Sequence, residues 1–430
     1  MRRFLFVITL TLAFCLPSGT WGQIKEGQSL NLEQSIRLAL KNHPSIKAAS
    51  SQYDINQSRV GQAKAAYYPD VNFASSYNRL STATQSGGQL IGQGPYDSYR
   101  STFTLTQNIY DFGKTASQVR IQRLNTDSAR SDLEDISDQV VLNVQQAYYT
   151  ALQAERNRVV AQDTVKQFEE HLAQAKGFYE VGTRAFFDVT KAEVDLSNAR
   201  LNLIRAENSV RLARVTLNNA MGTPNAQNYT LEDNLSYKPY LLTLEEAIQR
   251  AYKERPDLRS IIAKREAAEQ SISLARTSYF PFVTGNANYG WTGSNFSEQE
   301  NGWGIGAALN FPLFTGFLTK YQVEEAKANL RLFQASEDLL RQNILLSVQQ
   351  AALNIKEAEE RISTAALTVR QAEENLAIAN GRYQAGVGNP IEVTDALVNF
   401  NNSRTTHNQA LYDYKVAQAA MDRAIGVKYQ

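Results

Sequence analysis

Few residues of this 430-residue chain could perform catalysis or bind a metal ion. Its histidines are His43, His171 and His407, and its one cysteine is Cys15. Zinc sites and Cys–His nucleophiles need such groups in matched sets, and neither a histidine pair at ligand spacing nor a glycine-rich phosphate loop is present in the sequence. We interpret His43 as a loop residue, and His171 and His407 as residues on helix surfaces. No enzymatic activity, cofactor or metal site is therefore expected.

Charge and composition exclude further classes of protein. The chain has 44 Lys and Arg against 43 Asp and Glu, a net charge of +1, and no basic block that would favour nucleic-acid binding. Its three methionines, one of them the initiator, are too few for a relay of copper ions. A hydrophobic content of 43% predicts a folded protein.

Residues 1–22 have the pattern of an export signal. Arg2 and Arg3 precede thirteen apolar residues, too few to span a membrane, and a small-residue cleavage site follows. A lipoprotein signal fits less well, because Phe14 and not a small residue precedes Cys15. Cleavage would remove the cysteine, so packing alone must hold the exported chain together. No later segment is apolar enough to predict a transmembrane helix.

The sequence contains an internal repeat. Residues 31–77 match residues 243–289 at a constant offset of 212, and residues 118–222 match residues 322–426 at an offset of 204. The first copy has its eight extra residues between the two matched stretches. Two registers without gaps, with the same Pro and Gly positions, make chance similarity between helix-rich halves the weaker explanation. The predicted repeats are residues 23–222 and 223–430.

Each repeat predicts the same order of elements. A short helix begins at a capping box, Asn31 with Gln34 or Thr243 with Glu246, and ends before a proline. A second helix, a β-hairpin and a long helical hairpin follow, and the longest helices have about 65 residues, or ~100 Å. Apolar spacings of three and four predict helices packed side by side around a wet interior. The expected bounds are 45–67 and 257–279 for the second helices, about 69–112 and 281–314 for the β-hairpins, and about 114–221 and 318–425 for the helical hairpins.

The expected strands alternate apolar residues with Asn, Thr and Ser. A soluble hairpin packed against helices is one interpretation of this pattern. The aromatic ends of the apolar face favour another, with lipid on one face and a water-filled lumen on the other. The aromatic residues concerned are Tyr77, Tyr99, Tyr289, Trp291 and Trp303.

Four strands per chain cannot close a barrel, because about eight strands make the smallest closure. An open strand edge in lipid leaves backbone N–H and C=O groups unpaired, which costs several kcal/mol for each group. Several copies must then close one barrel with cyclic symmetry, and their helices would continue its lumen as a tube. The pattern therefore predicts a conduit, with a purely structural coiled-coil protein as an alternative.

The chain after residue 22 resembles the TolC-type outer-membrane efflux proteins. The resemblance rests on the duplicated layout and on short runs at corresponding places in both repeats. These runs are Tyr68-Pro69-Asp70 and Phe280-Pro281-Phe282 before the strands, Tyr110-Asp111-Phe112-Gly113 and Leu313-Phe314-Thr315-Gly316 after them, and Tyr179-Glu180-Val181-Gly182-Thr183 and Tyr383-Gln384-Ala385-Gly386-Val387 at the helix turns.

The resemblance implies a mixed α and β membrane protein of the Gram-negative outer membrane that extends into the periplasm. It implies a homotrimer with a twelve-stranded β-barrel, a periplasmic α-barrel and a mixed equatorial girdle. Such a channel is not an enzyme, and it receives substrates from an inner-membrane pump through a periplasmic adaptor. An outer-membrane conduit for type I protein secretion belongs to the same family and is the alternative.

Residue roles at the helix turns follow from the same resemblance. Glu392 and Asp395 match acidic residues at the closed pore end and lie one helical turn apart; an acidic helix start in solvent is the alternative. Gly182 and Gly386 are also expected at any turn that needs a positive φ. The turns that match the adaptor-docking tips are Val181-Gly182-Thr183 and Ala385-Gly386-Val387.

Tyr383 and Asp188 match a pair that ties neighbouring coiled coils shut in this family. The family's gate often has an arginine after the second tip glycine, where this chain has Gly388. We expect closure to depend on a hydrogen bond between Tyr383 and Asp188, with Arg184 of the first turn as a possible substitute for the missing arginine.

Overall fold

The computed structural model describes residues 29–429 except 82, 87–88, 93–94 and 227–228. The expected signal sequence, with Cys15, lies outside the described residues. Contacts divide the chain into two compact units, and each unit contains parts of both predicted repeats. Within the described residues, unit 1 comprises 29–44, 143–236 and 364–412, and unit 2 comprises 45–142, 237–363 and 413–429.

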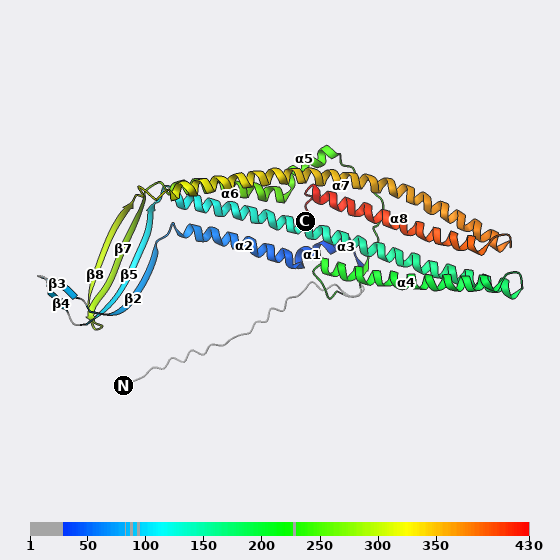
Figure 1. Cartoon of the computed structure of the whole chain (residues 1–430), viewed down its shortest axis with the longest axis horizontal. Coiled ribbons are helices and arrows are strands. Elements are labelled where there is room, and N and C mark those ends of the chain that lie inside the picture. The colour runs from blue at the N-terminus through cyan, green and yellow to red at the C-terminus, as the bar shows by residue number, and fades with distance from the viewer. Residues whose placement is uncertain (1–28, 82, 87–88, 93–94, 227–228, 430) are drawn as a thin grey trace, which may run out of the picture. The chain divides into compact units, whose positions relative to one another are not determined.

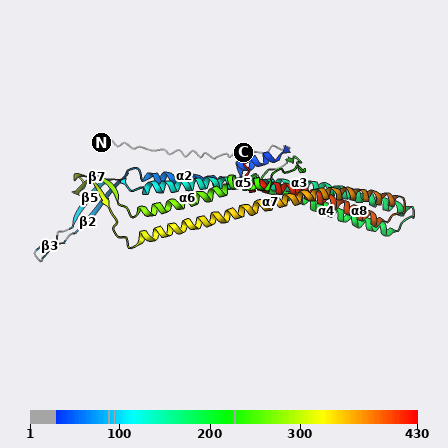
Figure 2. The same cartoon turned by 90° about the horizontal axis from the view of Figure 1, so that it is seen from above.

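Unit 1 contains two helical hairpins. Hairpin 1 consists of α3 (Lys114–Glu180) and α4 (Phe186–Ala220), and hairpin 2 of α7 (Leu318–Gln384) and α8 (Pro390–Ala424). The first parts of α3 and α7 and the end of α8 belong to unit 2. Figures 1 and 2 both show α4 beside the later part of α3, and α8 beside the later part of α7.

Short elements complete unit 1. Helix α1 (Leu32–Asn42) follows β1 (Ser29–Leu30), which pairs in parallel with β6 (Thr230–Leu231). The sequence pattern does not predict these two-residue strands. The hydroxyl of Tyr148 on α3 donates to the carbonyl oxygens of Leu30 and Glu232, so the strand pair is held against the hairpin helices.

The expected helix starts and stops are confirmed in both units. The Asn31 side chain accepts the N–H of Gln34 at 2.8 Å before α1, and the Thr243 hydroxyl accepts the N–H of Glu246 at 3.3 Å before α5 (Leu244–Glu254). His43 lies in an extended conformation after α1, as expected of a loop residue. The next helices are α2 (Pro44–Ala65) and α6 (Pro256–Thr277).

Unit 2 contains a four-stranded antiparallel sheet in the order β2-β5-β7-β8 (Figure 1). Its strands are β2 (Asp70–Leu80), β5 (Tyr96–Tyr110), β7 (Phe282–Asn295) and β8 (Glu298–Asn310). Pairing of β5 with β7 joins the two repeats in one sheet, and β2 and β8 each have a free edge within the described chain. The loop expected between β2 and β5 contains a further strand pair, β3 (Ala83–Ser86) and β4 (Gln89–Gly92). Four strands in the sheet therefore agree with the prediction, whereas the described chain has eight strands in all.

The strand register confirms the predicted alternation. Phe73, Phe103, Tyr289 and Trp303 lie opposite one another in a row across all four strands. The adjacent row on the other face is Asn72, Thr104, Asn288 and Gly304. Trp303 is 77% exposed, so the described helices do not cover the aromatic face, contrary to the alternative of a soluble hairpin packed against helices. Among the described helices, none has the length and apolar content needed to cross a membrane.

Candidate functional site at the tips of the helical hairpins

Both hairpins of unit 1 turn through the same backbone motif. Tip 1 comprises residues 181–185 and tip 2 residues 385–389, and the tip glycines Gly182 and Gly386 have φ angles of 73° and 77°. In each tip the glycine N–H donates to the carbonyl three residues back, and the next N–H donates to the carbonyl five residues back. This is a Schellman motif, which favours glycine at the residue with positive φ. The expected need for glycine at both turns is therefore confirmed.

The two tips enclose a groove with a volume of about 560 Å³. It brings Arg184, Asp188 and Lys191 of hairpin 1 close to Glu392 of hairpin 2. The side chains of Val181 and Val387 stand at the ends of the hairpins, each 71% exposed. The tips therefore present apolar side chains beside a groove that contains charges of both signs.

Arg184 connects the two tips. Its Nη2 atom donates to the carbonyl oxygen of Gly388 at 2.7 Å and to that of Gly386 at 3.4 Å. Its guanidinium carbon also lies 5.6 Å from the centre of the Tyr383 ring, within the range of a cation–π contact. The side chain considered as a substitute for the missing arginine thus binds the backbone of the opposite hairpin.

Gly388 is glycine for a steric reason. A Cβ at this position would lie 2.8 Å from the backbone nitrogen of Tyr383 and 2.9 Å from the carbonyl carbon of Arg382. Contacts this close to backbone atoms cannot be relieved by moving a flexible side chain. An arginine at residue 388 is therefore incompatible with this turn, and the cation that binds the tip 2 backbone is Arg184 of hairpin 1.

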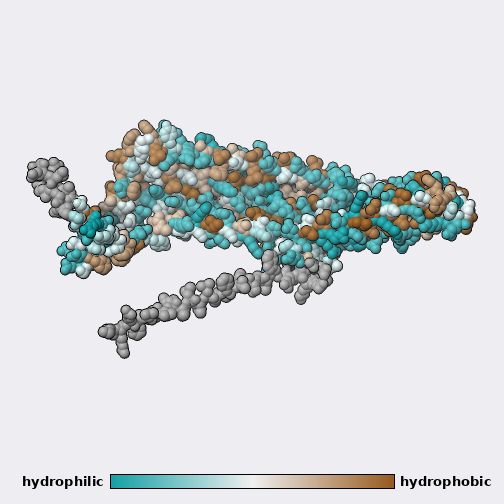
Figure 3. All heavy atoms as spheres, turned by 60° about the horizontal axis from the view of Figure 1, so that its bottom comes forward, coloured by the Kyte–Doolittle hydropathy of each residue, from teal (hydrophilic) through white to brown (hydrophobic). Residues whose placement is uncertain are grey.

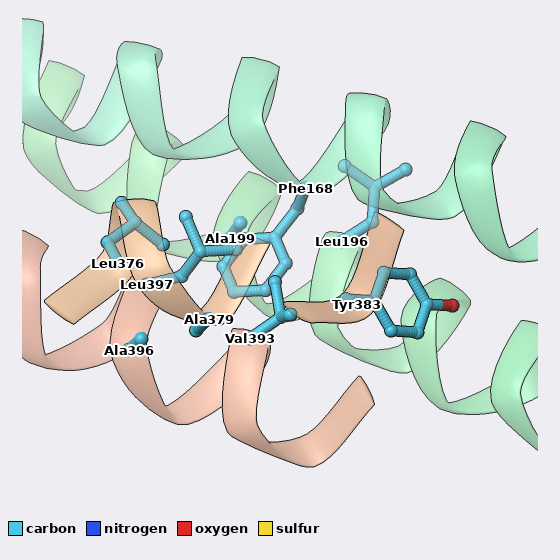
Figure 4. Packing of buried hydrophobic residues seen from close by; sticks show 9 residues of the cluster. All are labelled: Phe168, Leu196, Ala199, Leu376, Ala379, Tyr383, Val393, Ala396 and Leu397. Carbon is cyan, nitrogen blue, oxygen red and sulfur yellow. The ribbon is translucent and has the colours of Figure 1, made fainter. Parts of the chain in front are cut away.

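Tyr383 is fully buried between the hairpins. It belongs to an apolar cluster drawn in Figure 4, whose other members are Phe168, Leu196, Ala199, Leu376, Ala379, Val393, Ala396 and Leu397. The tyrosine hydroxyl is buried and has no hydrogen-bond partner among the described residues, so the expected bond to Asp188 is not formed within the chain. Burial, together with a smaller effect of the Asp188 carboxylate, raises the pKa of Tyr383. Apolar packing and Arg184 join the tips in place of that bond.

The interpretation of His171 as a residue on a helix surface was wrong. It is only 4% exposed, and its ring lies 5.3 Å from the ring of Tyr383, centre to centre. The buried Nδ1 atom has no hydrogen-bond partner among the described residues. The spacing from Phe168 and to Ala175, three and four residues, places His171 on the apolar seam of α3, and this pattern could have predicted its burial. His407 is half-buried on α8.

The acidic residues at the start of α8 are exposed. Glu392 lies 3.4 Å from the Nε atom of Arg382, and Asp395 follows one turn later. A contact that the sequence does not reveal joins α8 to α4 deeper between the hairpins, at the Asp195 carboxylate that Lys191 of the same helix binds at 2.7 Å. The hydroxyl of Thr394 on α8 donates to the same carboxylate at 3.2 Å.

No group of three His, Cys, Asp or Glu residues with metal-binding geometry occurs within the described part of the chain. Polar side chains instead form a series of contacts between α8 of hairpin 2 and α3 of hairpin 1. Arg404 pairs with Asp163 at 2.9 Å and Asn401 donates to Gln167 at 3.1 Å, in both cases from α8 to α3. The hairpins are therefore joined by apolar packing near the tips and by hydrogen bonds farther along.

The sequence model of the outer membrane efflux protein family matches residues 35–223 and 247–427. The chain belongs to this family. The two matched stretches begin 212 residues apart and end 204 residues apart, which are the two offsets of the internal repeat. The protein is accordingly an outer-membrane protein of the efflux-channel class found in Gram-negative bacteria.

Individual relatives are distant but match along nearly the whole chain. TolC of Vibrio cholerae is 23% identical over 443 aligned residues, which cover 99% of this chain and 96% of that protein. The alkaline protease secretion protein AprF of Pseudomonas aeruginosa is 24% identical, with 93% and 85% coverage. The solved structure of the outer membrane protein VceC from Vibrio cholerae superposes with a TM-score of 0.80 at 20% identity, covering 93% of this chain and 97% of that one. This similarity shows the fold.

Proposed function

We propose that the protein is the outer-membrane channel of a tripartite efflux or export system and that it acts as a homotrimer. The observation that carries the proposal is the sheet of unit 2, which has an exposed aromatic face and two edges that no other described strand pairs. In lipid, free edges must be paired by other strands. Two copies would supply eight strands, and side chains fill the interior of an eight-stranded barrel. Three copies would supply twelve strands and leave a lumen. The face with Asn, Thr and Gly would line that lumen.

Exposed leucines on α7 support the packing of a neighbouring copy against the helices. Leu332, Leu339, Leu346 and Leu353 follow one another at intervals of seven residues and are 51–68% exposed. Such spacing forms the apolar seam of a coiled coil, which needs a partner helix. Figure 3 shows apolar residues, in brown, on the surface of the helices. We assign this seam to the periplasmic α-barrel of the trimer.

The tips are the proposed docking site of a periplasmic adaptor, which would connect the channel to an inner-membrane pump. Exposed apolar side chains at the ends of the two hairpins, beside a charged groove, suit a protein partner better than solvent. The residues assigned to this contact are Val181, Gly182, Thr183, Ala385, Gly386 and Val387.

The pore end is proposed to lie at the start of α8. Three copies would bring six carboxylates of Glu392 and Asp395 around one axis, which would attract cations. Tyr383, Asp188 and Arg184 are assigned to the contacts that open and close this end. Glu392 forms an exposed ion pair with Arg382. Because exposed ion pairs contribute only ~0–1 kcal/mol, this pair can break readily and change the charge at the pore end.

The N-terminal segment and the repeats complete the proposal. Residues 1–22 would direct export and be removed, and residues 23–222 and 223–430 would be two copies of one ancestral unit. A second function, the outer-membrane conduit of type I protein secretion, is favoured by the similarity to a protein named for alkaline protease secretion.

The test is to extract the full chain from membranes in detergent and to reconstitute it in planar lipid bilayers. We expect trimers that resist heating on a gel, and long-lived conductance steps. The double variant Glu392→Gln with Asp395→Asn should reduce the preference for cations without abolishing conductance. A monomer that stays soluble in aqueous buffer without detergent would disprove the proposal.

A further inference from the structure

We propose that His171 is a proton-responsive latch, which holds Tyr383 of the opposite hairpin while it is neutral and releases the two tips when it is protonated. The proposal rests on the channel function above, since separation of the tips is the change that would widen the pore end. It assigns a regulatory role to a residue that lies outside the acidic pore end.

The geometry of His171 suits a neutral imidazole. His171 on α3 and Tyr383 on α7 belong to different hairpins, and both side chains are buried. Phe178 packs edge-on against the same tyrosine, at 5.3 Å between ring centres. The buried Nδ1 of His171 and the buried hydroxyl of Tyr383 have no hydrogen-bond partners in the described chain. An imidazolium has two N–H donors and a full charge, and burying it without acceptors is costly.

Charged groups around His171 shift its pKa in opposite directions. Asp195 and Asp188 on α4 favour the imidazolium, and Lys191 on the same helix opposes it. The Asp195 carboxylate is already bound by Lys191 and by the hydroxyl of Thr394 on α8. From α7 the neighbour is the neutral ring of Tyr383, which also lies near the guanidinium of Arg184.

Burial is the largest of these effects and lowers the pKa of His171 below its ordinary value of 6.5. When the hairpins separate, the exposed imidazole regains its ordinary pKa. The separated state therefore takes up a proton more readily than the packed state. The contribution of His171 to packing is complete above pH ~6.5 and is lost as the pH falls through the lowered pKa of the packed state.

The test is hydrogen–deuterium exchange of the full chain in detergent at about pH 7.5 and about pH 5.5, corrected for the intrinsic rate of exchange. In the wild type we expect protection of peptides around residues 168–183 and 376–389 to fall by about threefold or more on acidification, since one pKa unit corresponds to a tenfold change in equilibrium. His171→Gln, which does not titrate, should abolish this fall. His171→Phe keeps a ring against Tyr383 and provides a second non-titrating variant if the first does not fold.

His407→Gln is the matched control, because His407 is half-buried in the same unit and also has a pKa lowered by burial. It should retain the wild-type response at the tips. A fall of equal size in the His171 variants, or no fall in the wild type, would overturn the latch. Bilayer conductance separates this result from the channel proposal: if no channels form, the channel function fails, while exchange at the tips still decides the role of His171.

Discussion

Gly388 has no space for a side chain, because a Cβ there would lie 2.8 Å from the backbone nitrogen of Tyr383. Gly388→Ala should force a backbone shift that costs ~1–3 kcal/mol and displaces the carbonyl that Arg184 binds. We expect a lower thermal midpoint and more frequent channel opening in bilayers. Gly381→Ala is the control, since a Cβ at that helical position meets no atom within 4 Å. If both variants behave alike, close packing at tip 2 does not control the gate.

Residue identity alone predicted the turn glycines, because positive φ is a local requirement. It did not predict the contact of His171 with Tyr383, because that contact depends on the packing of α3 against α7. Arg184 as a substitute for a second-tip arginine in the gate stays a prediction. Its contact with two carbonyl oxygens depends on how closely the tips approach, and no local pattern encodes that distance.

The strands of the sheet allow a test at the scale of elements. Leu105 and Thr104 are neighbours on β5, but Leu105 shares the aromatic face and Thr104 the polar face. Leu105→Lys should destabilise the inserted sheet by up to ~2–4 kcal/mol, and Thr104→Lys should cost much less because it would face water. The measurement is the fraction of chain recovered from membranes as heat-resistant trimer. Equal losses for the two variants would contradict an assignment of lipid and lumen to opposite faces.

Long and regular elements could be predicted from the sequence, whereas short ones could not. The period-two alternation and the capping boxes are local signals that correspond directly to backbone geometry. The two-residue strands β1 and β6 have no such signal, because they form only where residues about 200 positions apart meet. The pair β3 and β4 lies in a segment that is rich in Gly and Gln, for which a loop was the simpler prediction.

At the scale of the whole chain, the repeats do not coincide with the compact units. Both units contain residues of each repeat, because β5 pairs with β7 in unit 2 and α8 bonds with α3 in unit 1. Internal similarity reveals the duplicated layout but not which elements of one copy contact those of the other. For the same reason the sequence identified the hairpins separately, and the structure was needed to pair them.

The two units should respond to acid in opposite directions. Burial, with the nearby carboxylate of Asp135, raises the pKa of Asp138 in unit 2 to about 6, although Arg423 opposes the shift. The folded state therefore binds this proton more tightly than the unfolded state, and the charge of Asp138 destabilises unit 2 increasingly from pH ~4 and fully above pH ~6. Asp138→Asn should raise the free energy of unfolding near neutral pH by ~1 kcal/mol after allowance for solvent screening. The gain should shrink as the pH falls toward 4.

Thermal unfolding of the Asp138→Asn variant and of the wild type across this pH range measures the difference. A gain that does not change with pH would mean that the carboxylate is not the titrating group. Exchange data on the wild type provide the contrast between the units. Acid should loosen peptides near His171 while leaving those around Asp138 as protected as before, or more so. General acid destabilisation would increase exchange in both places, whereas increased exchange near His171 alone is consistent with neutral His171 and charged Asp138 acting through burial.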